Sequence, residues 1–183
     1  MIFNKSNLGF GVYIKPKSVK FSGKKMSKKS AGILLFRYNN NVPEVLLVHP
    51  GGPFWINKGY GAWSIPKGEF TSENPLEASK REIKEELGLK LEGNFIELKP
   101  IRQKSGKTIY AWAVENDINP LEIKSNLFEL EWPPHSGTIN FFPEIDKAEW
   151  FKMNEALEKI IPGQAGFIKQ LEQKIHGVED HPF

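Results

Sequence analysis

The sequence predicts a layered domain of α/β or α+β class, in which helices pack on a sheet. Short apolar runs bounded by turn residues predict the strands, and helical patterns lie between and after them. The length of 183 residues, with 39% apolar residues, suits one domain with a sizeable core. We therefore predict a single domain over residues 30–176, preceded by a basic extension (1–29) and followed by a short tail (177–183).

The first two predicted strands form a hairpin. Residues 31–38 and 44–48 are apolar runs, and residues 39–43 between them favour turns. A loop rich in glycine and aromatic residues follows from 49 to 61, and residues 63–65 are predicted to be extended. This loop is placed to line a pocket.

The strongest helical pattern begins after Asn74. Asn74 is a preferred N-cap residue, Pro75 suits the first helical position, and Glu77 stands where a capping box needs an acidic side chain. Gly88 supplies a C-terminal stop, so the predicted helix covers residues 75–87. The apolar stripe expected to pack on the sheet consists of Leu76, Ile83 and Leu87.

The second half of the chain alternates strands and helices. The predicted strands cover residues 95–101, 108–114 and 148–152, and the predicted helices cover residues 154–160 and 163–175. We find no internal repeat and no low-complexity tract. This alternation is what indicates a layered domain.

The composition excludes several classes of protein. The chain has no cysteine, so disulfides, thiolate zinc sites and a cysteine nucleophile are excluded. No run of 18 apolar residues occurs, and residues 8–14 are too short and glycine-broken for a signal-peptide core. We expect a soluble, cytoplasmic protein without a membrane partner.

The net charge of +3 is concentrated in the basic extension, where seven lysines lie between residues 15 and 29. Such a run can contact nucleic acid or anionic lipid. No aromatic stacking pattern or binding motif accompanies it, which favours a solvated, mobile tail. We therefore expect no DNA partner and do not favour RNA, and Met26 is an alternative start.

Three carboxylates, Glu82, Glu85 and Glu86, share a narrow arc of the predicted helix. Like charges at spacings of three and four repel, so their concentration calls for a compensating cation. An isolated cluster of this kind is more often a solvated helix face balanced by lysine and arginine. The alternative is a metal site, and all-oxygen ligands select Mg²⁺ or Mn²⁺, which bridge to substrate phosphate.

The surrounding residues favour the metal site. Gly68, Glu73 and the run REIKEELGL that starts at Arg81 resemble the Nudix box almost position for position. The family has five residues between the glycine and the first glutamate, whereas four separate Gly68 from Glu73. We interpret this as a one-residue loop deletion, because Glu73 then keeps the seven-residue spacing to Arg81.

The resemblance implies a Nudix fold, which is an α/β/α sandwich with a mixed sheet, and a hydrolase that uses Mg²⁺, with Mn²⁺ as a substitute. It also implies that Arg81 and Glu73 orient the metal shell. The implied metal ligands are the Gly68 carbonyl and the carboxylates of Glu82, Glu85 and Glu86.

The segment before the box adds candidates for substrate binding. Trp63-x-x-Pro-Lys67-Gly resembles the approach to the box in diadenosine polyphosphate hydrolases of the family. Lys67 is then placed to attract phosphate, and the alternatives are a surface lysine and, for Trp63, a core aromatic. Candidate rings for stacking a nucleobase, a less common role than packing, are Phe54, Trp55 and Trp132.

A later carboxylate is a further candidate. Several Nudix enzymes carry one six residues before a Trp-aromatic pair, and Glu144 precedes Trp150 by six. In a loop, Glu144 completes the metal shell or acts as general base, and an exposed loop glutamate is the alternative. Glu129 and Glu131 are weaker rivals, and the sequence does not decide whether Glu82 or Glu144 accepts the proton.

The resemblance, to MutT-like and diadenosine polyphosphate hydrolase-like bacterial Nudix proteins, favours a dinucleoside polyphosphate of the diadenosine tetraphosphate type as substrate. A (d)NTP or an oxidised dNTP is the alternative. A non-catalytic nucleotide-binding module is a different class, against which the intact carboxylates argue, and an RNA-end-processing enzyme is another. We expect a small-molecule nucleotide as partner and a monomer or homodimer.

Overall fold

The computed structural model describes residues 28–177, which form a mixed sheet with helices on both faces. The strands are β1 (Lys29–Asn39), β2 (Val42–Pro50), β3 (Lys67–Phe70), β4 (Ile96–Arg102), β5 (Thr108–Glu115), β6 (Leu127–Glu131), β7 (Ile139–Pro143) and β8 (Ile145–Lys152). The helices are α1 (Pro75–Leu87), α2 (Met153–Lys159) and α3 (Ala165–His176), with 3₁₀ turns η1 (Pro120–Glu122) and η2 (Pro162–Gln164). The predicted α/β/α sandwich with a mixed sheet is confirmed.

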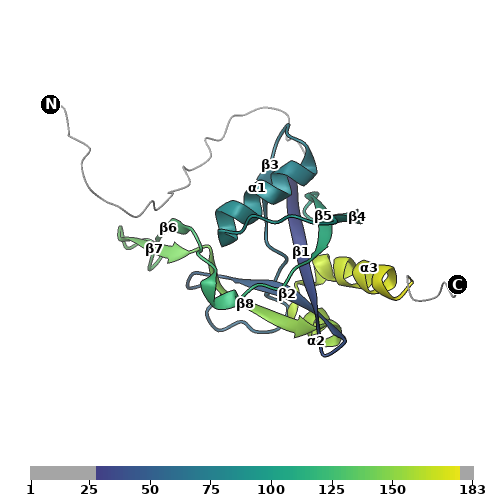
Figure 1. Cartoon of the computed structure of the whole chain (residues 1–183). Coiled ribbons are helices and arrows are strands. Elements are labelled where there is room, and N and C mark those ends of the chain that lie inside the picture. The colour runs from purple at the N-terminus through teal and green to yellow at the C-terminus, as the bar shows by residue number, and fades with distance from the viewer. Residues whose placement is uncertain (1–27, 178–183) are drawn as a thin grey trace, which may run out of the picture.

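Strand β1 organises the sheet, whose order is β4-β5-β1-β2-β8. It runs parallel to β5 and antiparallel to β2, and its first residues pair antiparallel with β3. Strands β6 and β7 form a separate hairpin that extends away from the sheet (Figure 1). Helix α1 lies on one side of the sheet, and α2 and α3 lie on the other (Figure 1).

Two apolar clusters fill the space between these layers. Ile33 and other inward residues of β1 pack with Ile83 and Leu87 of α1. On the opposite face, Leu34 of β1 packs with Phe167 of α3. Neighbouring residues of β1 are therefore both buried, as expected for a strand whose two faces are covered.

Helix α1 begins and ends where the sequence predicts. The Asn74 side chain accepts hydrogen bonds from Leu76 N (2.9 Å) and Glu77 N (3.4 Å), and Gly88 ends the helix with a left-handed φ of 72°. The Glu77 carboxylate accepts a bond from Lys80 Nζ (3.0 Å) and does not form the capping box expected for it. Leu76 of the predicted stripe is half-buried.

The sequence did not predict β3, β6 or β7. Residues 63–65, expected to be extended, form isolated bridges through Trp63 and Ser64, and β3 begins only at Lys67. Strand β8 starts at Ile145, three residues before its predicted start at 148. Strand β3 depends on pairing with β1, which lies far from it in the sequence, so local propensity does not reveal it. Strands β6 and β7 pair with each other.

The ends of the chain lie largely outside the described residues. Of the predicted extension (1–29), only Lys28 and Lys29 are described, and Lys29 belongs to β1. Of the predicted tail, Gly177 alone is described. The domain boundaries therefore stay predictions. Between residues 28 and 177, no helix is long and apolar enough to cross a membrane.

Candidate active site

Gly68 of β3 lies directly against Glu82 of α1. Gly68 pairs with Ala31 of β1, and a Cβ built at Gly68 would overlap the Glu82 carboxylate. Only glycine therefore lets this carboxylate reach the backbone of β3. Glu82 is 1% exposed, which excludes the solvated-face interpretation for this residue.

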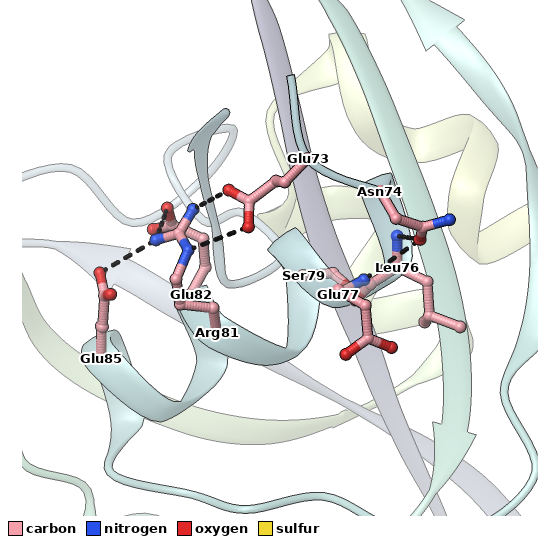
Figure 2. A network of polar contacts seen from close by, with 8 residues as sticks. All are labelled: Glu73, Asn74, Leu76, Glu77, Ser79, Arg81, Glu82 and Glu85. Atoms are coloured by element: carbon pink, nitrogen blue, oxygen red, sulfur yellow. Dashed lines mark hydrogen bonds and ion pairs between the residues drawn. The ribbon is translucent and has the colours of Figure 1, made fainter. Parts of the chain in front are cut away.

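Arg81 of α1 bonds the carboxylates of Glu73, Glu82 and Glu85 (Figure 2). Its Nη2 donates to Glu73 Oε1 (2.6 Å), and its Nη1 donates to Glu82 Oε1 (2.7 Å) and Glu85 Oε2 (3.2 Å). The bond to Glu73 raises the pKa of the Arg81 guanidinium, burial opposes this rise, and the Glu82 and Glu85 bonds add to it. Arg81 and Glu73 would need these hydrogen bonds in order to orient the carboxylates of Glu82 and Glu85.

Lys67, Glu86 and Glu144 line one small cavity of about 100 Å³. The backbone N–H of Lys67 donates to Glu86 Oε2 (2.9 Å). Oε2 of Glu144 is buried and has no hydrogen-bond partner among residues 28–177. The fold therefore brings Glu144, which stands at the bend between β7 and β8, to the carboxylates of α1.

Burial and neighbouring charges both act on the Glu86 carboxyl in this cavity. Burial raises the pKa of the Glu86 carboxyl to about 8. The charge of Lys67 opposes this rise, whereas the charges of Glu82 and Glu144 add to it. Burial also lowers the pKa of the Lys67 ammonium, and the charge of Glu86 opposes this fall. An additional cation would relieve the repulsion.

Replacing Glu86 by glutamine is expected to stabilise the protein in EDTA at about pH 8.5 and to change little near about pH 5. Its folded pKa of about 8 exceeds the ordinary 4.5, so stability is lost as the pH rises between these values. Glutamine cannot ionise and avoids this loss. We expect a gain of about 2 kcal/mol in the free energy of unfolding, measured by urea denaturation. An equal gain at both pH values would contradict the electrostatic cause.

The predicted metal ligands share this region without converging on one point. Glu82 and Glu85 bond Arg81, whereas Glu86 bonds Lys67. Between residues 28 and 177, no group of three acidic or histidine side chains is arranged to hold a metal ion. The donors are nevertheless all oxygens, which suits a hard divalent cation.

Trp63 belongs to the core. It is 5% exposed, and its ring makes edge contacts with His49 (5.2 Å) and Phe151 (4.9 Å). This placement agrees with the core alternative and gives no support to the substrate contact predicted for Trp63. His49 is buried as well, with its two ring nitrogens bonded to Asp146 Oδ1 (2.6 Å) and Lys58 O (2.7 Å), so its role is structural.

Phe54 is 54% exposed and packs edge-on against Trp132, with ring centroids 5.1 Å apart. Phe54 lies in the loop after β2, and the same loop donates a hydrogen bond from Gly51 N to Glu144 O (3.0 Å). Trp132 directly follows β6. Phe54 therefore comes from a loop that adjoins Glu144, whereas Trp132 lies in the turn of the β6–β7 hairpin and reaches this region through Phe54. Both rings stay candidates for contact with a nucleobase.

The rival carboxylates Glu129 and Glu131 lie on β6, away from this cavity. Glu131 Oε1 accepts a bond from Gly137 N (2.9 Å) within the hairpin turn.

One residue that the sequence did not single out does contact the site: Asn126 Nδ2 donates to Glu85 O (2.9 Å). No local pattern marks Asn126, because its partner is 41 residues away.

Comparison with known families decides the assignment. A family model described as the NUDIX domain matches residues 26–171. The chain belongs to the Nudix family. The predicted resemblance is confirmed, and family membership makes this Nudix protein a pyrophosphohydrolase that acts on nucleoside diphosphate-linked compounds. Nudix hydrolases generally use divalent metal ions.

Solved structures share the fold of this Nudix protein. The NUDIX domain of Shewanella oneidensis NrtR complexed with ADP ribose is 15% identical, with a TM-score of 0.57 over 83% of this chain and 90% of that one. A C. elegans Ap4A hydrolase in a binary complex is 18% identical, with a TM-score of 0.57 over 81% and 98%. A mutT/nudix family protein from Listeria innocua is 14% identical, with a TM-score of 0.56 over 85% and 98%. No curated protein matches the sequence.

Proposed function

We propose that this Nudix protein hydrolyses a phosphoanhydride bond in a dinucleoside polyphosphate of the diadenosine tetraphosphate type, with Mg²⁺ as cofactor. The observation that carries the proposal is the pocket of carboxylates beside Gly68, in which Glu86 and Glu144 face Lys67. Such a pocket suits a cation that binds phosphate. The Trp63-x-x-Pro-Lys67-Gly resemblance supports this substrate class.

The proposed ligands of Mg²⁺, or of Mn²⁺ in its place, are the Gly68 carbonyl and the carboxylates of Glu82, Glu85, Glu86 and Glu144. Two observations fit a cation here: Glu144 Oε2 is buried without a hydrogen-bond partner in the described range, and the pKa of Glu86 is raised. When bound, the ion supplies positive charge that offsets the charge developing on phosphate oxygens.

Water is the proposed nucleophile. Its oxygen forms a bond to phosphorus while the anhydride P–O bond breaks, and the electron pair leaves on the bridging oxygen. The proton of the water passes to a carboxylate. We assign this step to Glu144, whose buried Oε2 accepts no hydrogen bond from residues 28–177.

Other side chains are proposed to bind and orient the substrate. Lys67 lines the cavity beside Glu86, where its ammonium can pair with a phosphate oxygen. The Phe54 side chain is exposed and Trp132 is half-buried, so both rings present surface on which one base can stack. Arg81 and Glu73 hold the carboxylates of α1 in place.

A substrate panel tests the proposal. The full chain is incubated with diadenosine polyphosphates, (d)NTPs, 8-oxo-dGTP, ADP-ribose and capped RNA, with Mg²⁺ or EDTA, and the products are separated by chromatography. We expect fastest turnover of a diadenosine polyphosphate, loss in EDTA, and loss of about 100-fold or more in Glu85→Gln. Faster turnover of a (d)NTP would replace the substrate class, and nucleotide binding without any turnover would favour the non-catalytic module.

A further inference from the structure

Hydrogen bonds hold the backbone of Glu144 on both sides. Its N–H donates to Asn126 O (2.8 Å), and its carbonyl accepts from Gly51 N–H (3.0 Å). The next amide, that of Ile145, donates to Ser125 Oγ (2.8 Å). Glu144 stands at a bend between two strands, so these bonds to residues 125–126 and Gly51 fix its position.

Asn126 also contacts helix α1. Its Nδ2 donates to the backbone carbonyl of Glu85 (2.9 Å). Helix α1 ends at Leu87, so the carbonyl of Glu85 is among the last four, which have no partner inside a helix. The Asn126 side chain therefore satisfies a helix-terminal carbonyl on the turn that carries Glu85 and Glu86.

We propose that Asn126 is a positioning residue that sets the spacing between Glu144 and the carboxylates of α1. One residue holds both partners, because its side chain bonds the helix while its main-chain carbonyl bonds Glu144. That spacing matters to the site, since Glu86 and Glu144 line one cavity. The inference rests on the proposed function only through the role of Glu144.

The test compares Asn126→Ala with Asn140→Ala in the full chain. Asn140 is a matched control, because it is also half-buried and its Nδ2 also donates to a backbone carbonyl, that of Trp132 (2.7 Å), but within the hairpin. We expect Asn126→Ala to lower kcat by about 10- to 100-fold and to change KM by less than about 3-fold. Calorimetric titration with Mn²⁺ should show affinity weakened by about 10-fold. Asn140→Ala should leave kcat and the Mn²⁺ affinity near those of the parent.

A double-mutant cycle shows whether Asn126 acts through Glu144. In a Glu144→Gln background, Asn126→Ala should lower kcat by less than about 2-fold further. An equal loss in both backgrounds, or unchanged kcat and Mn²⁺ affinity in Asn126→Ala, would overturn the inference. If Glu144→Gln alone retains full turnover, Glu144 has no role to position and the inference fails while hydrolysis stands. If the parent turns over no substrate, the proposed function fails, and the Mn²⁺ titration still decides the role of Asn126.

Discussion

Replacing Glu82 by glutamine is expected to lower kcat by about 1,000-fold and leave the domain folded. Glutamine keeps the shape of the side chain, which is buried against Gly68, but removes its charge. The proposed cation then loses a proposed ligand, and Arg81 loses an ionised partner at 2.7 Å. Steady-state hydrolysis of the best substrate of the panel measures the effect, with circular dichroism to confirm the fold.

Glu77→Gln is the matched control for this change. Glu77 lies on the same helix, but its carboxylate is exposed and bonds Lys80 at 3.0 Å. Exposed ion pairs contribute little to stability, so the melting temperature should stay within about 2 °C of that of the parent. The value of kcat should stay within about 2-fold. A loss of less than about 10-fold in Glu82→Gln would show that Glu82 is not an essential ligand.

Gly68→Ala is expected to abolish measurable turnover and to lower the free energy of unfolding by about 1–3 kcal/mol. The new methyl group would overlap the Glu82 carboxylate, which is enclosed on its other sides and cannot withdraw without moving α1 or β3. Either movement separates the Gly68 carbonyl from the box carboxylates. Urea denaturation and the same hydrolysis assay measure the two effects.

Gly59→Ala serves as the control for the added methyl group. A Cβ at Gly59 meets no atom within 4 Å, and this glycine does not have a positive φ. Turnover and stability should therefore remain close to those of the parent. Wild-type turnover in Gly68→Ala would mean that the contact between Gly68 and Glu82 is not needed for the reaction.

The parts of the fold that could be predicted depend on signals local in the sequence. Helix α1 was located because Asn74 caps it, Gly88 ends it, and its apolar residues recur at helical spacing. The hairpin of β1 and β2 was located because two apolar runs flank residues 39–43, which favour turns. In the structure Asn40 and Asn41 of this turn have positive φ. In both cases residues close together in the sequence are sufficient to predict the element.

The remaining features depend on contacts between distant segments. Strand β3 has the polar sequence KGEF and is a strand because β1 pairs with it. From the sequence, Trp63 was equally compatible with a place in the core and with a substrate contact. The fold places its ring between His49 and Phe151. Likewise, spacing from Trp150 singled out Glu144, but only the fold shows that it shares a cavity with Glu86.

The hairpin β6–β7 begins and ends at the candidate active site. Asn126 precedes it and Glu144 follows it, and the bond between their backbones (2.8 Å) closes the segment at its base. Residues 127–143 therefore form a loop whose two ends are already fixed together, and a change in its length or tip need not move the carboxylates. The tip carries Trp132, a proposed contact for a nucleobase, so a change at the tip would alter that proposed contact without altering the carboxylates. The hairpin could therefore be replaced by another of different length while its base stays in place.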